Sequence, residues 1–393
     1  MAPRVACMFS RRVPADLAPN RIAAATAVAG EVPFDLTVSN PTVCGLPYPA
    51  SLLQPLADAA GLSYRPDPRG LAVARAAVAR EYARQGAAVD PRQVVLTAST
   101  SEAYAFLFKL LCEPGESVLV PSPSYPLFEH LARVEGVVAR EYALDAEHGW
   151  AVDVPSLAGA PATTRAVVVV HPNNPTGSFV SPEDARALAA VCAEREWALI
   201  ADEVFLDYPL STGATPPTSF AASAAALTFT LGGLSKSLGL PQLKLAWICV
   251  GGPPALTEAA LKRLEFIADT FLSVATPVQL ALPTLLRDAA GVRAAISDRC
   301  RSNLAALRAL AHSHPAVEVL PPGGGWSAVL RIPAVIPEEE LVLELLRSDG
   351  VAVHPGYFFD FPRDGMLVVS LLPSPELFTA GVARVLARVA ALL

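Results

Sequence analysis

The sequence has few charged residues, no block of like charges and no long apolar run. Charged side chains make up only 17% of its 393 residues, and 30 basic against 37 acidic residues give a net charge of −7. Proteins that bind a nucleic-acid backbone usually present a basic patch, so we expect no nucleic-acid partner. Apolar residues form 52% of the chain, but in runs shorter than the roughly 18 residues that cross a bilayer. We therefore expect no membrane-spanning segment.

Cysteine is scarce and widely spaced. No two of the six cysteines form a Cys-x-x-Cys pair, and the close histidine pair His312 and His314 has no cysteine or third histidine nearby in the sequence. This spacing predicts no metal site and favours a reduced, cytoplasmic compartment. The cysteines are Cys7, Cys44, Cys112, Cys192, Cys249 and Cys300.

An arginine pair near the amino terminus resembles a secretion signal. Ser10-Arg11-Arg12 precedes a short, mostly apolar run over residues 22–30. Asp16 and Pro19 intervene, however, and Arg21 directly precedes the run. We interpret the run as an amphipathic helix of the mature chain.

Short β-rich runs alternate with helical stretches between about residues 94 and 250. This alternation predicts a mostly parallel sheet with helices on both faces. The run Ala166–Val170 does not alternate between apolar and polar residues, which is typical of a strand buried on both faces. Ser181-Pro182 is typical of a helix start. The predicted strands span residues 93–97, 117–120, 166–170, 198–201, 227–231 and 246–250.

The last third of the chain has a different pattern. Long helical stretches rich in Ala, Leu and Arg begin near residue 251. A second αβ unit then opens at Gly323–Trp326, with β-rich runs over 327–332 and 366–372 before a final helix. With 393 residues and about 150 residues per domain, the chain has room for two to three domains.

Lysine is the rarest charged residue, with only Lys109, Lys236, Lys244 and Lys262. Lys236 follows the predicted strand 227–231 through a turn that contains two glycines, which let a backbone bend tightly. Open αβ sheets bind ligands at the carboxyl ends of their strands. A lysine in such apolar surroundings loses solvation, so its pKa falls and its amine becomes a nucleophile.

Two further segments end strands at the same edge of the predicted sheet. An Asn173-Asn174 turn follows the strand 166–170, and Asp202 follows the strand 198–201. A carboxylate, a carboxamide and a lysine that converge there suit a pyridine aldehyde cofactor. The carboxylate holds the ring nitrogen protonated, the amide donates to a phenolate oxygen, and the lysine forms an imine.

The same residues stand in a recognisable series of motifs. In order they are Tyr64-x-Pro-Asp-Pro-x-Gly70, Pro123-Ser124-Tyr125-Pro126, Asn173-Asn174-Pro175-Thr176-Gly177, Asp202-Glu203-Val204, and Ser235-Lys236 followed by Gly239-Leu240-Pro241. Over residues 64–372 the chain resembles the class I/II aminotransferases, the fold-type I enzymes that depend on pyridoxal 5′-phosphate (PLP). Each motif is weak alone, but their order and separations together are specific.

The resemblance implies a role for individual residues. Lys236 is similar to the Schiff-base lysine, Asp202 to the carboxylate on the ring nitrogen, Asn174 to the donor to the ring oxygen, and Tyr125 to the aromatic residue that stacks on the ring. The phosphate site that it implies comprises Ser99, Thr100 and Ser101 at a helix start, together with Ser235, and Lys244 where the family commonly has arginine. Tyr64 resembles a tyrosine that reaches the phosphate from the neighbouring subunit, which implies a homodimer with shared active sites.

The resemblance also implies an α/β fold of two domains. The large domain holds a mostly parallel, seven-stranded sheet between helices, and a smaller α+β domain is formed by both chain ends. The corresponding boundaries place residues 1–45 in the small domain, 46–290 in the large PLP-binding domain and 291–393 in the small domain.

Four positions depart from the family pattern. Phe205 stands where a tyrosine usually donates to the ring oxygen, Gly233 where a serine is common, and Ser39 where glycine is common. Most consequential is Val368, at the position expected for the arginine that clasps the substrate α-carboxylate. The loss of that bidentate contact removes about 1.5 to 3 kcal/mol per hydrogen bond to a charged group.

Another cation could replace the missing arginine, or the substrate could present no carboxylate there. Arg21 and Arg331 are the candidate replacements. Trp326, Tyr357 and Phe358 would give the site an aromatic lining suited to a sizeable apolar or aromatic substrate side chain.

These observations leave three functions open. The first is a PLP-dependent aminotransferase that moves an amino group from an amino acid or amine to an oxo acid through Lys236. The second is another PLP reaction on the same scaffold, such as elimination or decarboxylation, because fold and cofactor do not fix the reaction. The third is a PLP-binding protein without turnover.

Overall fold

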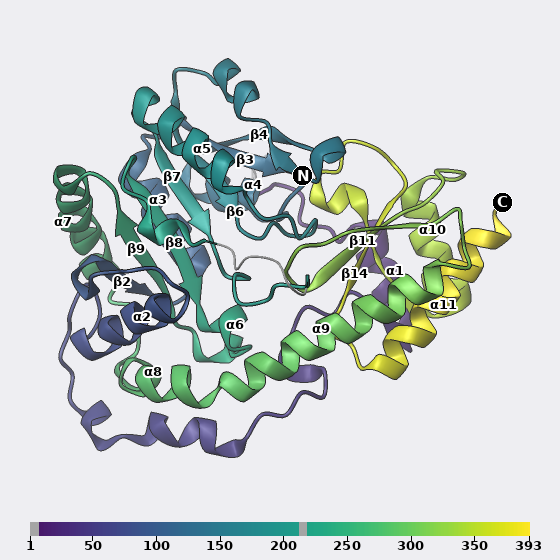
Figure 1. Cartoon of the computed structure of the whole chain (residues 1–393), viewed down its shortest axis with the longest axis horizontal. Coiled ribbons are helices and arrows are strands. Elements are labelled where there is room, and N and C mark those ends of the chain that lie inside the picture. The colour runs from purple at the N-terminus through teal and green to yellow at the C-terminus, as the bar shows by residue number, and fades with distance from the viewer. Residues whose placement is uncertain (1–7, 212–217) are drawn as a thin grey trace.

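The computed structural model describes residues 8–211 and 218–393. Two main sheets, each with helices against it, and a third sheet of two short strands make up the molecule (Figure 1). The helices are α1 (Arg21–Ala29), α2 (Ala72–Arg84), α3 (Thr100–Leu111), α4 (Phe128–Glu135), α5 (Pro182–Arg195), α6 (Leu234–Ser237), α7 (Pro254–Phe271), α8 (Thr276–Asp288), α9 (Ala290–Ala311), α10 (Glu338–Glu344) and α11 (Pro375–Ala391). The strands are β1 (Phe34–Asp35), β2 (Val94–Thr97), β3 (Ser117–Ser122), β4 (Val138–Asp145), β5 (Ala151–Val152), β6 (Thr164–Val170), β7 (Ala198–Asp202), β8 (Thr228–Gly233), β9 (Ala246–Gly251), β10 (Glu318–Leu320), β11 (Ser327–Arg331), β12 (Val351–Ala352), β13 (His354–Pro355) and β14 (Met366–Ser370).

The large sheet has the strand order β2-β9-β8-β7-β6-β3-β4-β5. The pairs from β8 through β7, β6 and β3 to β4 are parallel, whereas β9 runs antiparallel to both its neighbours. All six predicted strands are present, and the mostly parallel architecture is confirmed. Seven strands form the sheet proper, and the two-residue β5 adds an eighth at its edge.

Successive side chains of the central strands enter two different cores. Val168 packs into a cluster with residues of α3 and α7, whereas Val167 and Val169 pack into a cluster with residues of α5. Because side chains alternate across a strand, a strand covered on both faces needs an unbroken apolar run. The absence of alternation in β6 is thus explained by helices on both sides of the sheet.

The small sheet is antiparallel and has the order β10-β11-β14-β13. Close to it, β1 near one chain end pairs in parallel with β12 near the other, with Phe34 opposite Val351. The long helix α9 runs from the α8 region of the large sheet to the small sheet (Figure 1). The two chain ends are therefore joined in one structural unit.

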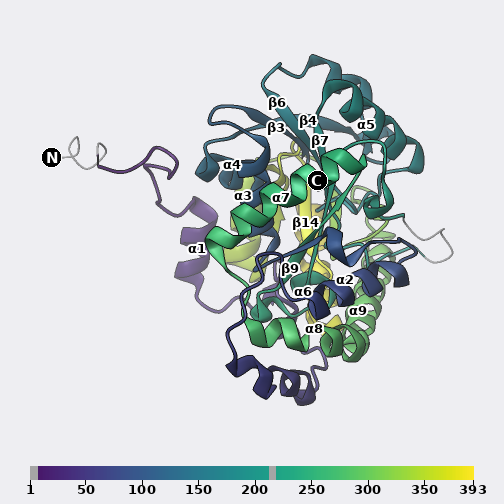
Figure 2. The same cartoon turned by 90° about the vertical axis from the view of Figure 1, so that its left-hand side faces the viewer.

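Helix starts follow their capping residues. The side chain of Ser181 accepts a hydrogen bond from the Asp184 amide over 3.0 Å, with Pro182 in the first helical turn, which confirms the predicted start of α5. Asn20 caps α1 through the Ala23 amide over 2.8 Å. Residues 22–29 are thus helical as expected, and residues 8–20 before α1 lie at one edge of the molecule (Figure 2), where the Arg11 carbonyl accepts a hydrogen bond from Arg133 of α4 over 3.4 Å. Within residues 8–211 and 218–393, no helix combines the length and apolarity that a bilayer crossing needs.

Candidate active site

A cavity of about 440 Å³ opens where the parallel strands end and the small sheet begins. It has walls from both sheets, from the start of α3 and from the segment after β1. This position agrees with the general preference of open αβ sheets for ligands at strand carboxyl ends. The predicted residues that line it are Ser99, Thr100, Ser101, Tyr125, Asn174, Asp202, Phe205, Ser235, Lys236, Lys244 and Trp326.

Lys236 lies in the one-turn helix α6 that directly follows β8. The glycines before it are needed because β9 passes close by: a Cβ on Gly232 would lie 2.6 Å from the Trp247 indole nitrogen, and one on Gly233 2.9 Å from the Ala246 Cβ. The amine lies 5.1 Å from the ring centre of Trp326 and 5.6 Å from that of Phe205. Burial lowers the pKa of Lys236, and the charge of Asp202 opposes that shift.

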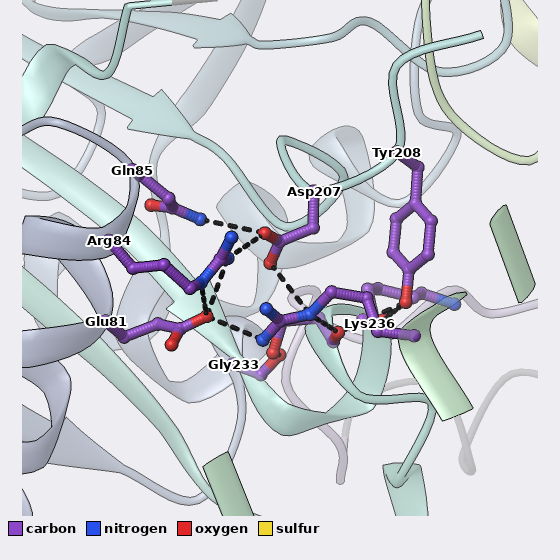
Figure 3. Close-up of polar contacts among 9 residues, drawn as sticks. Glu81, Arg84, Gln85, Asp207, Tyr208, Gly233 and Lys236 are labelled. Atoms are coloured by element: carbon purple, nitrogen blue, oxygen red, sulfur yellow. Dashed lines mark hydrogen bonds and ion pairs between the residues drawn. The ribbon is translucent and has the colours of Figure 1, made fainter. Parts of the chain in front are cut away.

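The backbone around Lys236 is held by buried polar groups (Figure 3). The Tyr208 hydroxyl donates to the carbonyl oxygen of Lys236 over 2.8 Å and to that of Ser237 over 3.1 Å. Arg293 of α9 donates from Nε to the Ser237 carbonyl over 3.0 Å. The turn is therefore tied to the helix that leads to the small sheet.

Arg293 in turn belongs to a compact network of charges between α2 and α9. Figure 3 labels the other members of this network, Glu81, Arg84, Gln85 and Asp207. The Nη2 of Arg293 donates to Glu81 over 2.6 Å, and its Nε lies 3.7 Å from the Asp207 carboxylate. Arg84 contacts both carboxylates, and Gln85 donates to Asp207 over 3.2 Å. The carboxylates of Glu81 and Asp207 are almost fully buried. Hydrogen bonds from these donors therefore replace the water that each carboxylate has lost.

Asp202 ends β7 and is 7% exposed. Its Oδ2 accepts a hydrogen bond from the Tyr104 hydroxyl over 3.0 Å, and its Oδ1 accepts one from the Val204 amide over 3.2 Å. Burial raises the pKa of Asp202 to about 6, against the lowering effect of those donors and of Lys236. Among the described residues, no cation is in direct contact with this buried carboxylate.

The two asparagines after β6 have different surroundings. Asn173 is buried and fully engaged: it donates to the Pro123 carbonyl and to the Thr176 hydroxyl, each over 2.9 Å, and accepts from Ser124 over 2.7 Å. Asn174 lines the cavity, where its Oδ1 lies 3.5 Å from the Ser327 hydroxyl. The first asparagine builds the turn and the second presents its amide to the cavity.

Gly177 closes that turn against the small-sheet unit. It has φ +72°, and a Cβ there would lie 2.6 Å from the Gly324 carbonyl oxygen. Its own carbonyl accepts hydrogen bonds from the amides of Gly323 and Gly324 over 3.0 and 2.9 Å. This close approach, which only glycine permits, brings Trp326 to the cavity.

Hydroxyls and one further lysine line the cavity beside the paired residues Thr97, Ala246 and Gly233 of β2, β9 and β8. Ser99 caps α3, and the amides and hydroxyls of Thr100 and Ser101 begin that helix. Ser235 and Lys244 line the same cavity from the segments after β8 and before β9. A helix start with hydroxyls and a nearby ammonium is a typical environment for a phosphate group.

Tyr64 lies outside this cavity. It is 74% exposed and lines a separate hollow with Asp67 and Leu272. Tyr125, by contrast, lines the cavity and packs edge-on against Phe128, with ring centres 5.8 Å apart. The expected pair of tyrosines is therefore divided between two surfaces of one chain.

The two arginines expected to replace a carboxylate-binding arginine do not line the cavity. Arg21 is bound at the surface by Glu339 and Glu340 of α10 over 2.5 and 2.9 Å. Arg331 pairs with Glu318 at the far end of β11, four residues or about 13 Å along the strand from the cavity-lining end. Within a single chain, the expectation that either supplies the missing cation is wrong.

Several cavity residues have no clear signal in the sequence. Tyr104 faces Asp202 because it lies one helical turn into α3, a relation between segments 98 residues apart. His354 comes from the two-residue strand β13, which is too short to leave a periodic pattern. The remaining members of this group are Thr37, Ser327, Phe359 and Ser370.

Comparison with known protein families agrees with this geometry. The family described as aminotransferase class I and II matches residues 49–380. The chain belongs to the class I and II aminotransferases. The predicted family and enzyme class are thereby confirmed, and the relatives below give no support to the alternatives of another reaction or of a protein without turnover.

Relatives from several organisms share this assignment. An alanine aminotransferase of Mycobacterium tuberculosis is 28% identical over 366 residues, which cover 89% of this aminotransferase and 83% of the relative. A glutamate-pyruvate aminotransferase of Haemophilus influenzae is 27% identical over 350 residues, or 86% of each chain. Both matches extend over most of the two proteins compared.

Solved structures confirm the fold-type I architecture. A mutant of Thermus thermophilus aspartate aminotransferase superposes with a TM-score of 0.83 at 26% identity, covering 98% of this chain and 99% of that one. An alanine aminotransferase of Pyrococcus furiosus gives a TM-score of 0.85 at 22% identity, covering 98% of this chain and all of that one.

Proposed function

We propose that this aminotransferase binds PLP in the cavity through Lys236 and transfers the amino group of an amino acid to an oxo acid. The observation that carries the proposal is the state of the Lys236 amine. It is buried, its pKa is lowered, and it has no hydrogen bond or ion pair among the described residues. A buried ammonium without a partner is costly, so burial favours the neutral amine. The neutral amine is the form of lysine that attacks a carbonyl group.

The donor set around that amine fits the cofactor. Bound PLP supplies an aldehyde and an electron-withdrawing ring, which together make a proton on the substrate α-carbon acidic. Asp202 would keep a ring nitrogen protonated, and Asn174 would donate to a ring oxygen. Tyr125 offers an aromatic face, and Phe205 an apolar one. Lys236 then takes and returns the proton at the substrate carbon from its Nζ.

One group of hydroxyls in the cavity is assigned to the phosphate. The start of α3 offers Ser99, Thr100 and Ser101, and Ser235 adds another hydroxyl. Lys244 contributes a charge without the planar fork of an arginine. All of these donors line a single cavity, and Ser99, Ser235 and Lys244 each lie two residues from one of the paired residues Thr97, Gly233 and Ala246. This grouping supports one extended ligand with a terminal anion.

We also propose a homodimer in which each active site uses two chains. Tyr64 is highly exposed and lies outside its own cavity, near other exposed apolar residues. A second copy that covers this surface would bring Tyr64 to the phosphate of its partner and would bury the side chains of Leu62, Phe266, Phe271 and Leu272, which are 48–91% exposed in one chain.

The substrates we propose are small amino and oxo acids. The names of the relatives, alanine and glutamate-pyruvate aminotransferase, favour alanine, glutamate and their oxo acids as the first compounds to test. Trp326 gives the cavity an aromatic wall, so aromatic amino acids belong in the same test. The proposed division of the chain stays at residues 1–45, 46–290 and 291–393, and the proposed location is the cytoplasm.

Trapping of the cofactor on the protein tests the central proposal. Purified protein with PLP is reduced with borohydride, digested and mapped by mass spectrometry. We expect the pyridoxyl label on Lys236 and an absorption change of the unreduced protein when an amino acid is added. Lys236→Ala should lose both signals, whereas the surface variant Lys109→Ala should keep both. A label on another lysine would refute the proposal.

Shared active sites are tested by mixing two inactive variants. Lys236→Ala chains and Tyr64→Ala chains are unfolded, mixed and refolded together. A mixed dimer then contains one site with both an intact Lys236 and an intact partner Tyr64, so part of the activity should return. Activity that stays at the level of the separate variants, although light scattering shows mixed dimers, would contradict sharing.

A further inference from the structure

No arginine of the described residues lines the part of the cavity that the small sheet forms. Within the described chain, the cationic or potentially cationic residues that line the cavity are Lys236, Lys244 and His354. Lys236 is the reactive amine of the proposed function, and Lys244 is assigned to the phosphate. His354 is thus the one titratable nitrogen base that the small sheet places in the cavity.

His354 lies directly beside Val368. The two residues are register partners on the antiparallel strands β13 and β14, so their side chains leave the sheet on the same face, with Cβ atoms about 5 Å apart. Both line the cavity. The imidazole therefore occupies the neighbourhood that a long side chain at position 368 would otherwise fill.

Two hydroxyls share this face of the small sheet. Ser370 lies two residues along β14 from Val368, and Ser327 is the register partner of Ser370 on β11. Side chains two residues apart on a strand point to the same side, and both serines line the cavity. One face of three adjacent strands thus presents an imidazole and two hydroxyls around the apolar Val368.

The imidazole is held in place by aromatic packing. Its ring centre lies 5.9 Å from that of Phe358 and 5.8 Å from that of Phe359. Burial lowers the pKa of His354, and the charge of Asp35 opposes the shift. A neutral imidazole keeps one N–H donor, and Ser370 adds an O–H donor. The Ser327 hydroxyl points its proton at Asn174 Oδ1 over a long 3.5 Å, and it becomes a third donor when it rotates toward the substrate.

We propose that His354, together with Ser327 and Ser370, binds the α-carboxylate of the amino acid substrate. This inference rests on the proposed function, since it assigns the carboxylate end of the same substrate. Three single-proton donors on a fixed sheet face replace the planar fork that an arginine would offer. Discrimination between an amino acid and the corresponding amine then depends on His354.

A pair of substitutions separates binding from packing. His354→Phe keeps the aromatic contacts with Phe358 and Phe359 but has no donor, whereas His354→Gln keeps an N–H donor but loses the ring. The remote, exposed His148 provides a control as His148→Ala. Each protein is used with bound PLP, and its PLP dissociation constant is measured first.

The probes are amino acids and their counterparts without the α-carboxylate. They are L-alanine with ethylamine, L-phenylalanine with 2-phenylethylamine, and L-glutamate with 4-aminobutyrate. Rates of the cofactor absorption change give kcat/KM for each compound. Competition by propionate, which has a carboxylate and no amine, gives a dissociation constant that does not depend on turnover.

For His354→Phe we expect kcat/KM for the preferred amino acid to fall at least tenfold and propionate to bind at least tenfold more weakly. Rates with the corresponding amine and the dissociation constant of PLP should stay within threefold of the unmodified protein. His354→Gln should recover most of the loss, and His148→Ala should change nothing.

Other outcomes would overturn the inference. They are an unchanged preference for amino acids in His354→Phe, a loss that His354→Gln shares in full, or an unmodified protein that prefers the amines. An unmodified protein with no borohydride label on Lys236 and no response to any amino compound would instead refute the proposed function, and this inference would fall with it.

Discussion

The hydroxyl of Tyr104 donates a hydrogen bond to Oδ2 of Asp202 over 3.0 Å, in a buried position. Asp202 has no cation in contact among the described residues. Its hydrogen-bond donors are the Tyr104 hydroxyl and the Val204 amide. A hydrogen bond to a charged group stabilises that group by about 1.5 to 3 kcal/mol. Tyr104 therefore helps to keep Asp202 ionised although burial raises its pKa to about 6.

We predict that Tyr104→Phe weakens PLP binding by about ten- to a hundredfold, which is that free energy expressed as an equilibrium constant. Loss of the donor raises the pKa of Asp202 further. The fall of PLP affinity on acidification should therefore begin at higher pH in the variant. PLP dissociation constants measured between pH 5 and 9 test this, with Tyr142→Phe as the control because the Tyr142 hydroxyl donates to the Val168 carbonyl instead. Parallel pH curves for Tyr104→Phe and the unmodified protein would contradict the assignment.

Phe205 lines the cavity close to the Lys236 amine. A tyrosine at this position could donate to the negatively charged ring oxygen of bound PLP, and a better stabilised anion holds the proton on the neighbouring Lys236 nitrogen less tightly. We predict that Phe205→Tyr lowers the pKa of that nitrogen by about half a unit to one unit, the equivalent of one ordinary hydrogen bond. A spectrophotometric pH titration measures the shift, and an unmoved titration curve would remove the idea.

Glu203 is buried beside the site and accepts hydrogen bonds from the Ser219 hydroxyl and the Phe220 amide, each over 2.6 Å. Burial raises its pKa to about 8. Between about pH 4.5 and 8 the unfolded chain loses this proton first, so the free energy of unfolding falls as pH rises, by at most about 1.4 kcal/mol per unit. Above pH 8 the effect is complete.

Glu203→Gln should remove this dependence. The variant should therefore gain stability relative to the unmodified protein as pH rises from 5 to 8, and the difference should then stay level. Urea unfolding of the PLP-free proteins at several pH values measures it, with the exposed Glu194→Gln as the control. A difference that does not change with pH would show that Glu203 ionises normally.

Arg293 bridges the buried carboxylates of Glu81 and Asp207 to the backbone beside Lys236. Removal of one partner from a buried ion pair costs about 3 to 5 kcal/mol, because a charge is left without compensation. We predict a loss of about 3 kcal/mol in the free energy of unfolding for Arg293→Met.

The control for Arg293→Met is a more exposed pair. Arg388 contacts Asp349 with two nitrogens, and both side chains are more than a fifth exposed. Arg388→Met should cost about 1 kcal/mol or less. Equal losses for the two variants in urea unfolding would mean that the buried network at Arg293 contributes no more to the free energy of unfolding than the exposed pair does.

Much of the fold could be predicted because its signals are local. Strand β6 contains the unbroken apolar run Ala166–Val170, which is visible in the sequence. Gly232 and Gly233, which the sequence predicts as a turn, instead extend β8 and pair with Trp247 and Ala246 of β9. Strand β4 was missed because its exposed and charged residues interrupt the apolar pattern. The two-residue strands β1, β12 and β13 are too short for any periodicity.

The candidate site likewise contains residues that could be predicted from the sequence and residues that could not. Lys236, Asp202 and Asn174 were predicted to converge because parallel strands bring their carboxyl ends to one edge, and all three line one cavity. Arg21 and Arg331 do not line the cavity within one chain, and the sequence does not show which carboxylate a guanidinium contacts. Both bind glutamates at the surface instead.

The sequence by itself determined the parallel sheet, the edge at which the cavity lies and the lysine on which the proposed chemistry depends. Periodicity and turn composition are properties of neighbouring residues, so they can be read along the chain. Only the tertiary structure placed Tyr104 against Asp202 and His354 beside Val368, since these contacts depend on helix packing and strand register. Register is set by the whole small sheet, in which each residue's partner lies in a different segment of the chain.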